Sequence, residues 1–182
     1  MLRYSTDTRS ETATLGDELE HVQNYLLLSK ARYEDNLSYV IDVPAEMRAF
    51  ILPKLTLQPL VENALTHGYN AVAYLRHVEI HGTIEGNLLC LTVRDSGAGF
   101  SDEKLLELRR NIALIESGSY TVLSDSKHIG LPNTCLRLYY YSRGAIHVRV
   151  SNDGGAVVRL TIPTHWSASN LSESENTGTT PA

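Results

Sequence analysis

The stretch QPLVENALTHG, residues 58–68, combines the pattern of a buried helix with polar side chains that a core helix seldom carries. Apolar side chains recur at helical spacing and predict one buried face: Leu57, Leu60, Val61, Ala64 and Leu65. A second face carries polar groups, with Glu62 at its border: Asn63, Thr66 and His67. The spacing predicts a helix from a Thr56 cap to about His67, with Pro59 tolerated in the first turn. The polar face is either solvated or part of a site.

Length and composition predict one main domain. The chain has 182 residues, of which 42% are hydrophobic, enough for one sizeable core and a short appended segment. A formal charge of −5 gives no basic field for direct nucleic-acid binding, and no apolar run approaches the roughly 20 residues that span a bilayer. We therefore expect a soluble chain. Cys90 and Cys135 lie in apolar contexts without CxxC spacing, which favours buried thiols in a reducing compartment.

The remaining pattern predicts an α/β chain. Helical spacing predicts further helices at residues 14–33, with Thr14 as cap, and at 102–114 and 131–141. Alternation predicts a strand at 37–43 and two hairpins, at 76–95 with its turn at Gly86 and at 144–163 with its turn at 152–155. Residues beyond Trp166 have little to bury, and we expect them to be disordered.

Two further motifs carry possible ligand chemistry. DSGAGF places Asp95 at a strand end before Gly97 and Gly99, a tight turn that lets a flat ligand lie against the backbone while the carboxylate accepts a hydrogen bond. The same pattern also occurs in ordinary turns. In HIGLPN, Gly130 and Leu131 open a helix whose N–H groups could meet phosphate.

In this order, QPLVENALTHG, DSGAGF, HIGLPN and GGAVVRLTIP resemble the N, G1, G2 and closing-strand boxes of the ATP-binding domain shared by gyrase, Hsp90, MutL and histidine kinases. ELEHVQNYLLLSKAR resembles the ELxxxxxYLxxxKxR linking segment of LytS-type sensor histidine kinases. The implied fold is a two-layer α/β sandwich of the Bergerat type, a mixed, mostly antiparallel sheet with helices on one face and an ATP lid. The implied division is the end of the dimerisation and phosphoacceptor region with the linking helix at 1–35, the ATP-binding catalytic domain at 36–165 and a tail at 166–182.

The resemblance also implies roles for individual residues. Asn63 would ligate the Mg²⁺ that bridges the phosphates of ATP, a role that suits an amide oxygen. Glu62 would be the catalytic base or polarising carboxylate beside the γ-phosphate, and His67 would lie along the phosphate path. Residues 101–129 would form the ATP lid.

The other implied contacts concern the base and the lid end. Asp95 would accept a hydrogen bond from the adenine amino group, and Gly97 and Gly99 would let the base pack closely. Gly130 and Leu131 would close the phosphate end of the site.

The chain departs from the family pattern at three positions. His128 stands where GxGL has its first glycine, Thr66 where lysine is common, and Ala156 where threonine is common. We expect these departures to reduce ATP affinity without abolishing it. Two alternatives stay open: a degenerate pseudokinase signalling module, and another ATPase of the superfamily, such as a kinase acting on a protein serine.

The resemblance implies partners as well as a ligand. The family's phosphoacceptor lies in a Pro-His-Phe-x-x-Asn motif that this chain lacks, and His21 belongs to the ordinary linking-helix pattern. We therefore expect the chain to present the γ-phosphate to a phosphoacceptor histidine upstream, within a homodimer. The phosphate would pass to a response regulator, which in this family is often a DNA-binding protein of the LytTR type. The parent protein would lie in the bacterial cell membrane, with this part in the cytoplasm.

Two other groups of residues invite a functional interpretation. His77, Glu79 and His81 share one face of a strand and could hold a metal ion, although an exposed polar strand face is the favoured interpretation. Arg137 could anchor a carboxylate in the core or approach the nucleotide.

Overall fold

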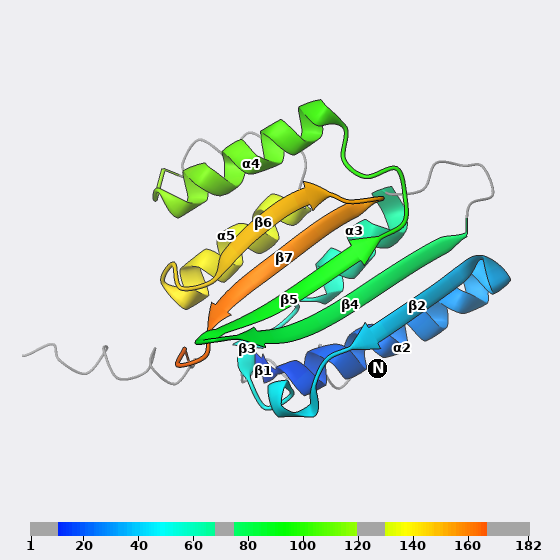
Figure 1. Cartoon of the computed structure of the whole chain (residues 1–182), viewed down its shortest axis with the longest axis horizontal. Coiled ribbons are helices and arrows are strands. Elements are labelled where there is room, and N and C mark those ends of the chain that lie inside the picture. The colour runs from blue at the N-terminus through cyan, green and yellow to red at the C-terminus, as the bar shows by residue number, and fades with distance from the viewer. Residues whose placement is uncertain (1–10, 68–74, 120–129, 167–182) are drawn as a thin grey trace, which may run out of the picture.

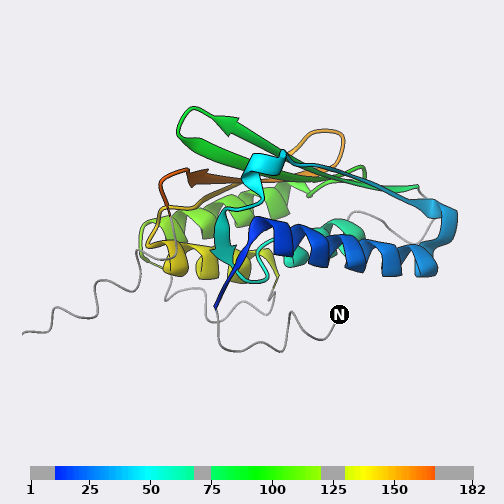
Figure 2. The same cartoon turned by 90° about the horizontal axis from the view of Figure 1, so that it is seen from below.

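A five-stranded sheet forms one layer of the structure and helices form the other (Figures 1 and 2). The computed structural model describes residues 11–67, 75–119 and 130–166. The strands lie in the order β2 (Leu37–Asp42), β4 (Arg76–Glu85), β5 (Leu88–Asp95), β7 (Ala156–Pro163) and β6 (His147–Asn152). β2 runs parallel to β4, and the other neighbours are antiparallel. The predicted mixed, mostly antiparallel sheet is confirmed.

The helices cover one face of this sheet (Figure 2). They are α2 (Leu15–Tyr33), α3 (Gln58–His67), α4 (Asp102–Glu116) and α5 (Leu131–Ser142), and 3-10 turns span Glu34–Asn36 and Ala45–Met47. A separate pair of strands joins β1 (Thr12–Thr14) to β3 (Ile51–Pro53). Within the described parts of the chain, no helix combines the length and the apolar character that a bilayer crossing requires. The architecture is the expected two-layer α/β sandwich.

The core lies between the sheet and the helices. Strand side chains alternate between the two faces of a sheet, so every second residue turns toward the helices. On the three central strands these buried side chains are Val78, Ile80, Leu89, Leu91, Val93, Val158, Leu160 and Ile162. The opposite face is polar, with an ion pair of 2.6 Å between Arg159 Nη2 and Glu85 Oε1.

Helix α2 is part of this core. Thr14 caps it as predicted, because the Thr14 hydroxyl accepts from Asp17 N–H and the Asp17 carboxylate accepts from Thr14 N–H. Its buried stripe belongs to the same apolar cluster as the sheet: Leu15, Leu19, Val22 and Leu26. The segment expected to link two regions therefore packs against the domain that follows it.

The start of α3 differs from the sequence prediction. Thr56 is fully buried and its hydroxyl donates to the carbonyl of Pro53, so it closes the preceding turn and does not cap the helix. The N–H groups of Leu55 and Leu57 donate instead to the carboxylate of Glu18 on α2, at 2.7 and 2.9 Å. A side chain from a distant helix thus satisfies donors that a local cap would usually serve.

The predicted ATP lid at 101–129 is also partly wrong. Residues Asp102–Glu116 form α4, which begins at a Ser101 cap and packs against α5 and β6. Leu108, Ile112 and Ile115 are buried in the core because they lie on one face of this helix. Residues Asp102–Glu116 are therefore part of the packed domain, while residues 120–129, including His128, lie outside the described part of the chain.

Candidate functional site

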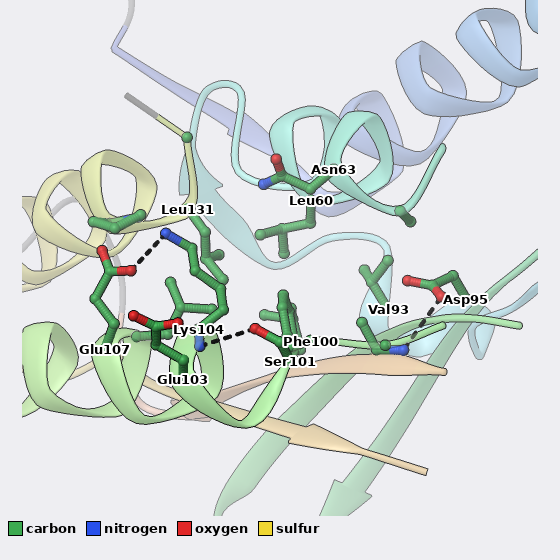
Figure 3. Close-up of a pocket in the computed structure, with 17 residues that line it drawn as sticks. Leu60, Asn63, Val93, Asp95, Phe100, Ser101, Glu103, Lys104, Glu107 and Leu131 are labelled. Atoms are coloured by element: carbon green, nitrogen blue, oxygen red, sulfur yellow. Dashed lines mark hydrogen bonds and ion pairs between the residues drawn. The ribbon is translucent and has the colours of Figure 1, made fainter. Parts of the chain in front are cut away.

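A cavity of about 730 Å³ opens between α3, the start of α4 and the ends of β5 and β7 (Figure 3). Segments that are far apart in the sequence meet around it. Five of the predicted site residues line it: Asn63, Asp95, Gly99, Gly130 and Leu131. Its size suits a nucleotide-sized ligand, and its walls combine apolar side chains with a few polar groups, as small-molecule sites do.

Asp95 lies at one end of the cavity and is 4% exposed. Its Oδ1 accepts hydrogen bonds from the N–H of Gly97, at 2.8 Å, and of Ala156, at 3.2 Å. Burial raises the pKa of Asp95, and these two N–H groups partly offset that effect because they stabilise the carboxylate. Its Oδ2 accepts no hydrogen bond from the described residues, so this oxygen is able to accept one from a ligand.

The turn after Asp95 is held by a side chain that sequence analysis missed. Asn152, at the end of β6, accepts from the N–H of Phe100 at 2.9 Å and donates to its carbonyl at 2.8 Å. A Cβ on Gly99 would lie 2.7 Å from Asn152 Oδ1, and Gly99 has φ +72. Glycine is therefore required at this position, both for the space and for the backbone conformation.

Asn63 lies on the cavity side of α3, opposite the start of α5. Its Nδ2 is buried and has no hydrogen-bond partner among the described residues. The backbone of Gly130 lies against the amide, since a Cβ there would come within 3.3 Å of Asn63 Oδ1. An unpaired buried amide costs about 1–3 kcal/mol. The orphan amide facing the cavity therefore fits a site completed by a polar ligand.

The structure does not bring Glu62 to the cavity wall. Its Oε1 accepts from Gln58 Nε2 at 2.7 Å, and Gln58 Oε1 lies 2.5 Å from His21 Nε2 on α2. Glu62 therefore joins a chain of hydrogen bonds that leads to α2. Gly97 contributes its N–H to Asp95 without lining the cavity. His67 ends α3, and its side chain lies outside the described part of the structure.

Two of the three departures from the family pattern can be described. The hydroxyl of Thr66 is turned back onto its own helix, where it donates to the carbonyl of Glu62. Ala156 lines the cavity and gives its backbone N–H to Asp95, a contact that any residue except proline could make. His128 lies among the residues that the structure does not describe.

The first turns of α4 supply cavity residues that sequence analysis missed. Phe100, Ser101, Glu103, Lys104, Glu107 and Leu108 line the cavity. The signal was present, because Lys104 and Leu108 are four positions apart on a predicted helix and so share a face. Assignment of the whole segment 101–129 to a lid gives this helix face no part in the cavity wall.

The other candidates lie away from the cavity. Arg137 donates to the carbonyl of Leu55, so it anchors the loop before α3. His77 Nε2 lies 3.0 Å from Glu79 Oε1 on the face of the sheet without helices, and His81 Nε2 lies 3.5 Å from the other Glu79 oxygen. Across residues 11–67, 75–119 and 130–166, no group of His, Cys, Asp or Glu is arranged as a metal site.

Comparisons with known proteins agree with this geometry. The family model of the histidine kinase-, DNA gyrase B-, and HSP90-like ATPases matches residues 51–165, and a histidine kinase model matches residues 1–37. The sensor protein kinase HptS of Staphylococcus aureus strain USA300 is 29% identical over 165 residues, which cover 90% of this chain. The chain spans 30% of the length of that relative.

Two solved structures share the fold. The histidine kinase domain of the Erythrobacter litoralis EL346 blue-light activated kinase has a TM-score of 0.57 at 14% identity, covering 88% of this chain and 67% of that one. The catalytic domain of histidine kinase ThkA has a TM-score of 0.57 at 16% identity, covering 84% and 94%. The chain therefore belongs to the histidine kinase-, DNA gyrase B- and HSP90-like ATPases and contains the ATP-binding catalytic domain of a two-component histidine kinase.

Proposed function

We propose that this cavity binds Mg·ATP and presents the γ-phosphate to a phosphoacceptor histidine on the dimerisation region of the same kinase dimer. The observation that carries the proposal is the meeting of Asp95, Asn63 and Gly130 around one cavity. Asp95 offers a carboxylate oxygen at one end. Beside the N-terminus of α5, Asn63 offers an unpaired N–H group on Nδ2 for a phosphate oxygen, and its Oδ1 is the atom that would ligate Mg²⁺. A purine with an exocyclic amino group fits the first, and a metal-bound phosphate chain fits the second.

The base would be recognised through Asp95. Its Oδ1 is committed to two backbone N–H groups, so Oδ2 would accept from the adenine amino group. Apolar side chains at this end would pack on the two faces of the ring: Leu60, Val93 and Val158. Gly97 and Gly99, which have no side chains, would let the base pack closely against the turn.

The phosphates would lie toward Asn63, Gly130 and Leu131. Asn63 would hold Mg²⁺, which neutralises phosphate charge when bound. The N–H groups at the start of α5 would donate to phosphate oxygens. His67 follows Asn63 by one helical turn and is proposed to line the phosphate path. Glu62 is bonded to Gln58 and does not line the cavity. Its proposed role is that of the catalytic base or polarising carboxylate beside the γ-phosphate.

The remaining proposals concern the whole protein. The segment ELEHVQNYLLLSKAR supports assignment to the LytS-type kinases. Full-length relatives of that type would form homodimers in the bacterial cell membrane and hold this domain in the cytoplasm. They would transfer phosphate to a response regulator of the LytTR type. A pseudokinase is the second candidate, favoured by the lack of a positive charge at Thr66. The histidine kinase match at residues 1–37 argues against a kinase that acts on serine.

The test is a calorimetric titration with a non-hydrolysable ATP analogue, with and without Mg²⁺. We expect saturable binding that requires Mg²⁺ and is lost in Asn63→Ala and in Asp95→Asn. Asn24→Ala, an exposed position on α2, is the matched control and should bind as the unmodified chain does. No binding by the unmodified chain would contradict the proposal and favour the pseudokinase.

A further inference from the structure

The described side chains that line the cavity carry a net negative charge, which would repel a polyphosphate. Among the described residues, three lining side chains are carboxylates: Asp95, Glu103 and Glu107. Lys104 is the single basic side chain in the described lining. Opposite charges attract and like charges repel more strongly where water is partly excluded. A bound triphosphate therefore needs positive charge beyond that of Mg²⁺, and among the described lining residues Lys104 offers it.

The position of Lys104 agrees with this requirement. The Ser101 hydroxyl accepts from the N–H of Lys104 at 3.2 Å, which fixes the first turn of α4. From there the side chain extends toward the Leu131 end of the cavity, whereas Asp95 lies at the opposite end (Figure 3). Leu131 begins α5, where the proposed phosphate contacts lie. The ammonium group is therefore on the phosphate side of the cavity.

Lys104 is paired in the structure. Its Nζ lies 2.9 Å from Glu107 Oε2, with the lysine side chain 35% exposed. A half-exposed ion pair of this kind contributes little to stability. The four-carbon stem is flexible, so the ammonium can exchange one carboxylate oxygen for a phosphate oxygen at small cost. Glu107 and a bound phosphate would thus compete for the same ammonium group.

We propose that Lys104 is the phosphate-binding cation of this site and supplies from α4 the charge that Thr66 on α3 lacks. The inference rests on the proposed function and adds a residue to it. It also gives a reason for ATP binding to survive the departure at Thr66, because the charge has moved to another wall of the same cavity.

The experiment compares ligands that differ in phosphate number. The unmodified chain, Lys104→Gln and Lys104→Arg are titrated with the ATP analogue, ADP and adenosine, with Mg²⁺ present. We expect Lys104→Gln to bind the ATP analogue about tenfold more weakly, ADP somewhat more weakly and adenosine equally well. Lys104→Arg should retain most of the affinity. Lys30→Gln is the matched control, because Lys30 is an exposed lysine of α2 that lies over the Tyr39 ring and does not line the cavity.

A second variant tests the pairing with Glu107. Glu107→Gln removes the competing carboxylate, so we expect it to bind the ATP analogue as tightly as the unmodified chain or more tightly. Equal affinity of Lys104→Gln and the unmodified chain for the analogue would overturn the inference while leaving the proposed function intact. An equal loss for adenosine and the analogue would also overturn it, because a charge acting on phosphate cannot affect adenosine. If the unmodified chain binds no nucleotide, the proposed function fails as well.

Discussion

At the scale of single residues, the buried carboxylate of Asp95 lowers the stability of the fold, although it is the group proposed to bind the nucleotide base. Burial raises its pKa in the folded chain above the unfolded value. The folded state therefore binds the proton more readily, and stability present at low pH is lost as the pH rises through the folded pKa. Asparagine keeps an oxygen for the N–H groups of Gly97 and Ala156 without a charge to desolvate. We expect Asp95→Asn to melt at the same or a higher temperature at neutral pH while losing nucleotide affinity.

The measurement is thermal unfolding of both proteins at neutral and at acidic pH, with and without ADP. The difference between the two melting temperatures should shrink as the carboxyl becomes protonated. A variant that melts well below the unmodified chain at neutral pH would show that the charge of Asp95 stabilises the fold, contrary to this expectation.

Gly155 is a position where the addition of a single methyl group should strongly destabilise the fold. A Cβ there would lie 1.8 Å from the carbonyl oxygen of Asp95, which is backbone and cannot swing away. We expect Gly155→Ala to cost about 3 kcal/mol of unfolding free energy and to weaken nucleotide binding. Gly86→Ala is the contrasting control: its φ is +60 but the space around it is open, so it should cost about 1 kcal/mol. Urea unfolding measures both, and equal losses would refute the steric argument.

Local residue chemistry was the most predictable part of the site. Four of the residues that line the cavity can be predicted because each occurs in a short sequence motif: Asn63, Asp95, Gly99 and Gly130. Asn152 could not be found in this way, because its contact with Phe100 joins residues that are distant in the sequence. The sequence also does not predict that the Glu62 side chain contacts Gln58. Glu62 lies at the border of two helix faces, so its position alone does not show which neighbour its side chain contacts.

At the scale of elements, α2 holds the start of the helix that carries Asn63. The carboxylate of Glu18 is 1% exposed and accepts the N–H groups of Leu55 and Leu57. Leu55 has φ +59, a strained conformation that these contacts and the hydrogen bond from Arg137 maintain. The Glu18 carboxylate replaces the local cap that the sequence suggested at Thr56. No short-range sequence pattern predicts this contact, because Glu18 is far from Leu55 and Leu57 in the sequence.

We therefore expect Glu18→Ala to lower the free energy of unfolding by about 2–4 kcal/mol, because the buried N–H of Leu57 and the half-buried N–H of Leu55 lose their acceptor. Nucleotide affinity should fall too, since the first turn of α3 would loosen. Glu20→Ala, an exposed neighbour on the same helix, should change neither quantity. Urea unfolding followed by nucleotide titration separates the effects, and an unchanged midpoint for Glu18→Ala would contradict the role assigned to this carboxylate.

Element boundaries were predicted better than element roles. Helical and alternating patterns located α2, α3, α5 and the hairpins because periodic burial repeats within each of them. The role of α4 was misjudged, since its buried stripe of Leu108, Ile112 and Ile115 contacts elements that lie far along the chain. A helix pattern in a long connection is compatible with a lid or with a core helix until its packing partners are known.

At the scale of the whole molecule, α2 and the sheet share one apolar cluster. We expect Leu26→Ala on α2 to cost about 2–5 kcal/mol, as for other buried leucines. Leu89→Ala on β5 should have a comparable effect, and both should shift a single unfolding transition. Leu28→Ala is the matched control, because Leu28 is 58% exposed and should leave the transition in place. Two separate transitions in the unmodified chain would show that α2 unfolds independently of the domain.

The position of β7 affects how the chain acquires its activity during synthesis. β7 lies between β5 and β6, although both precede it in the sequence. While a ribosome extends the polypeptide, β5 therefore keeps one edge unpaired until the last strand emerges, and such an edge invites chaperone capture or mispairing. The N–H of Ala156, at the start of that strand, donates the second backbone hydrogen bond to the Asp95 carboxylate. A nascent chain thus gains its affinity for nucleotide only after almost the whole domain has been translated.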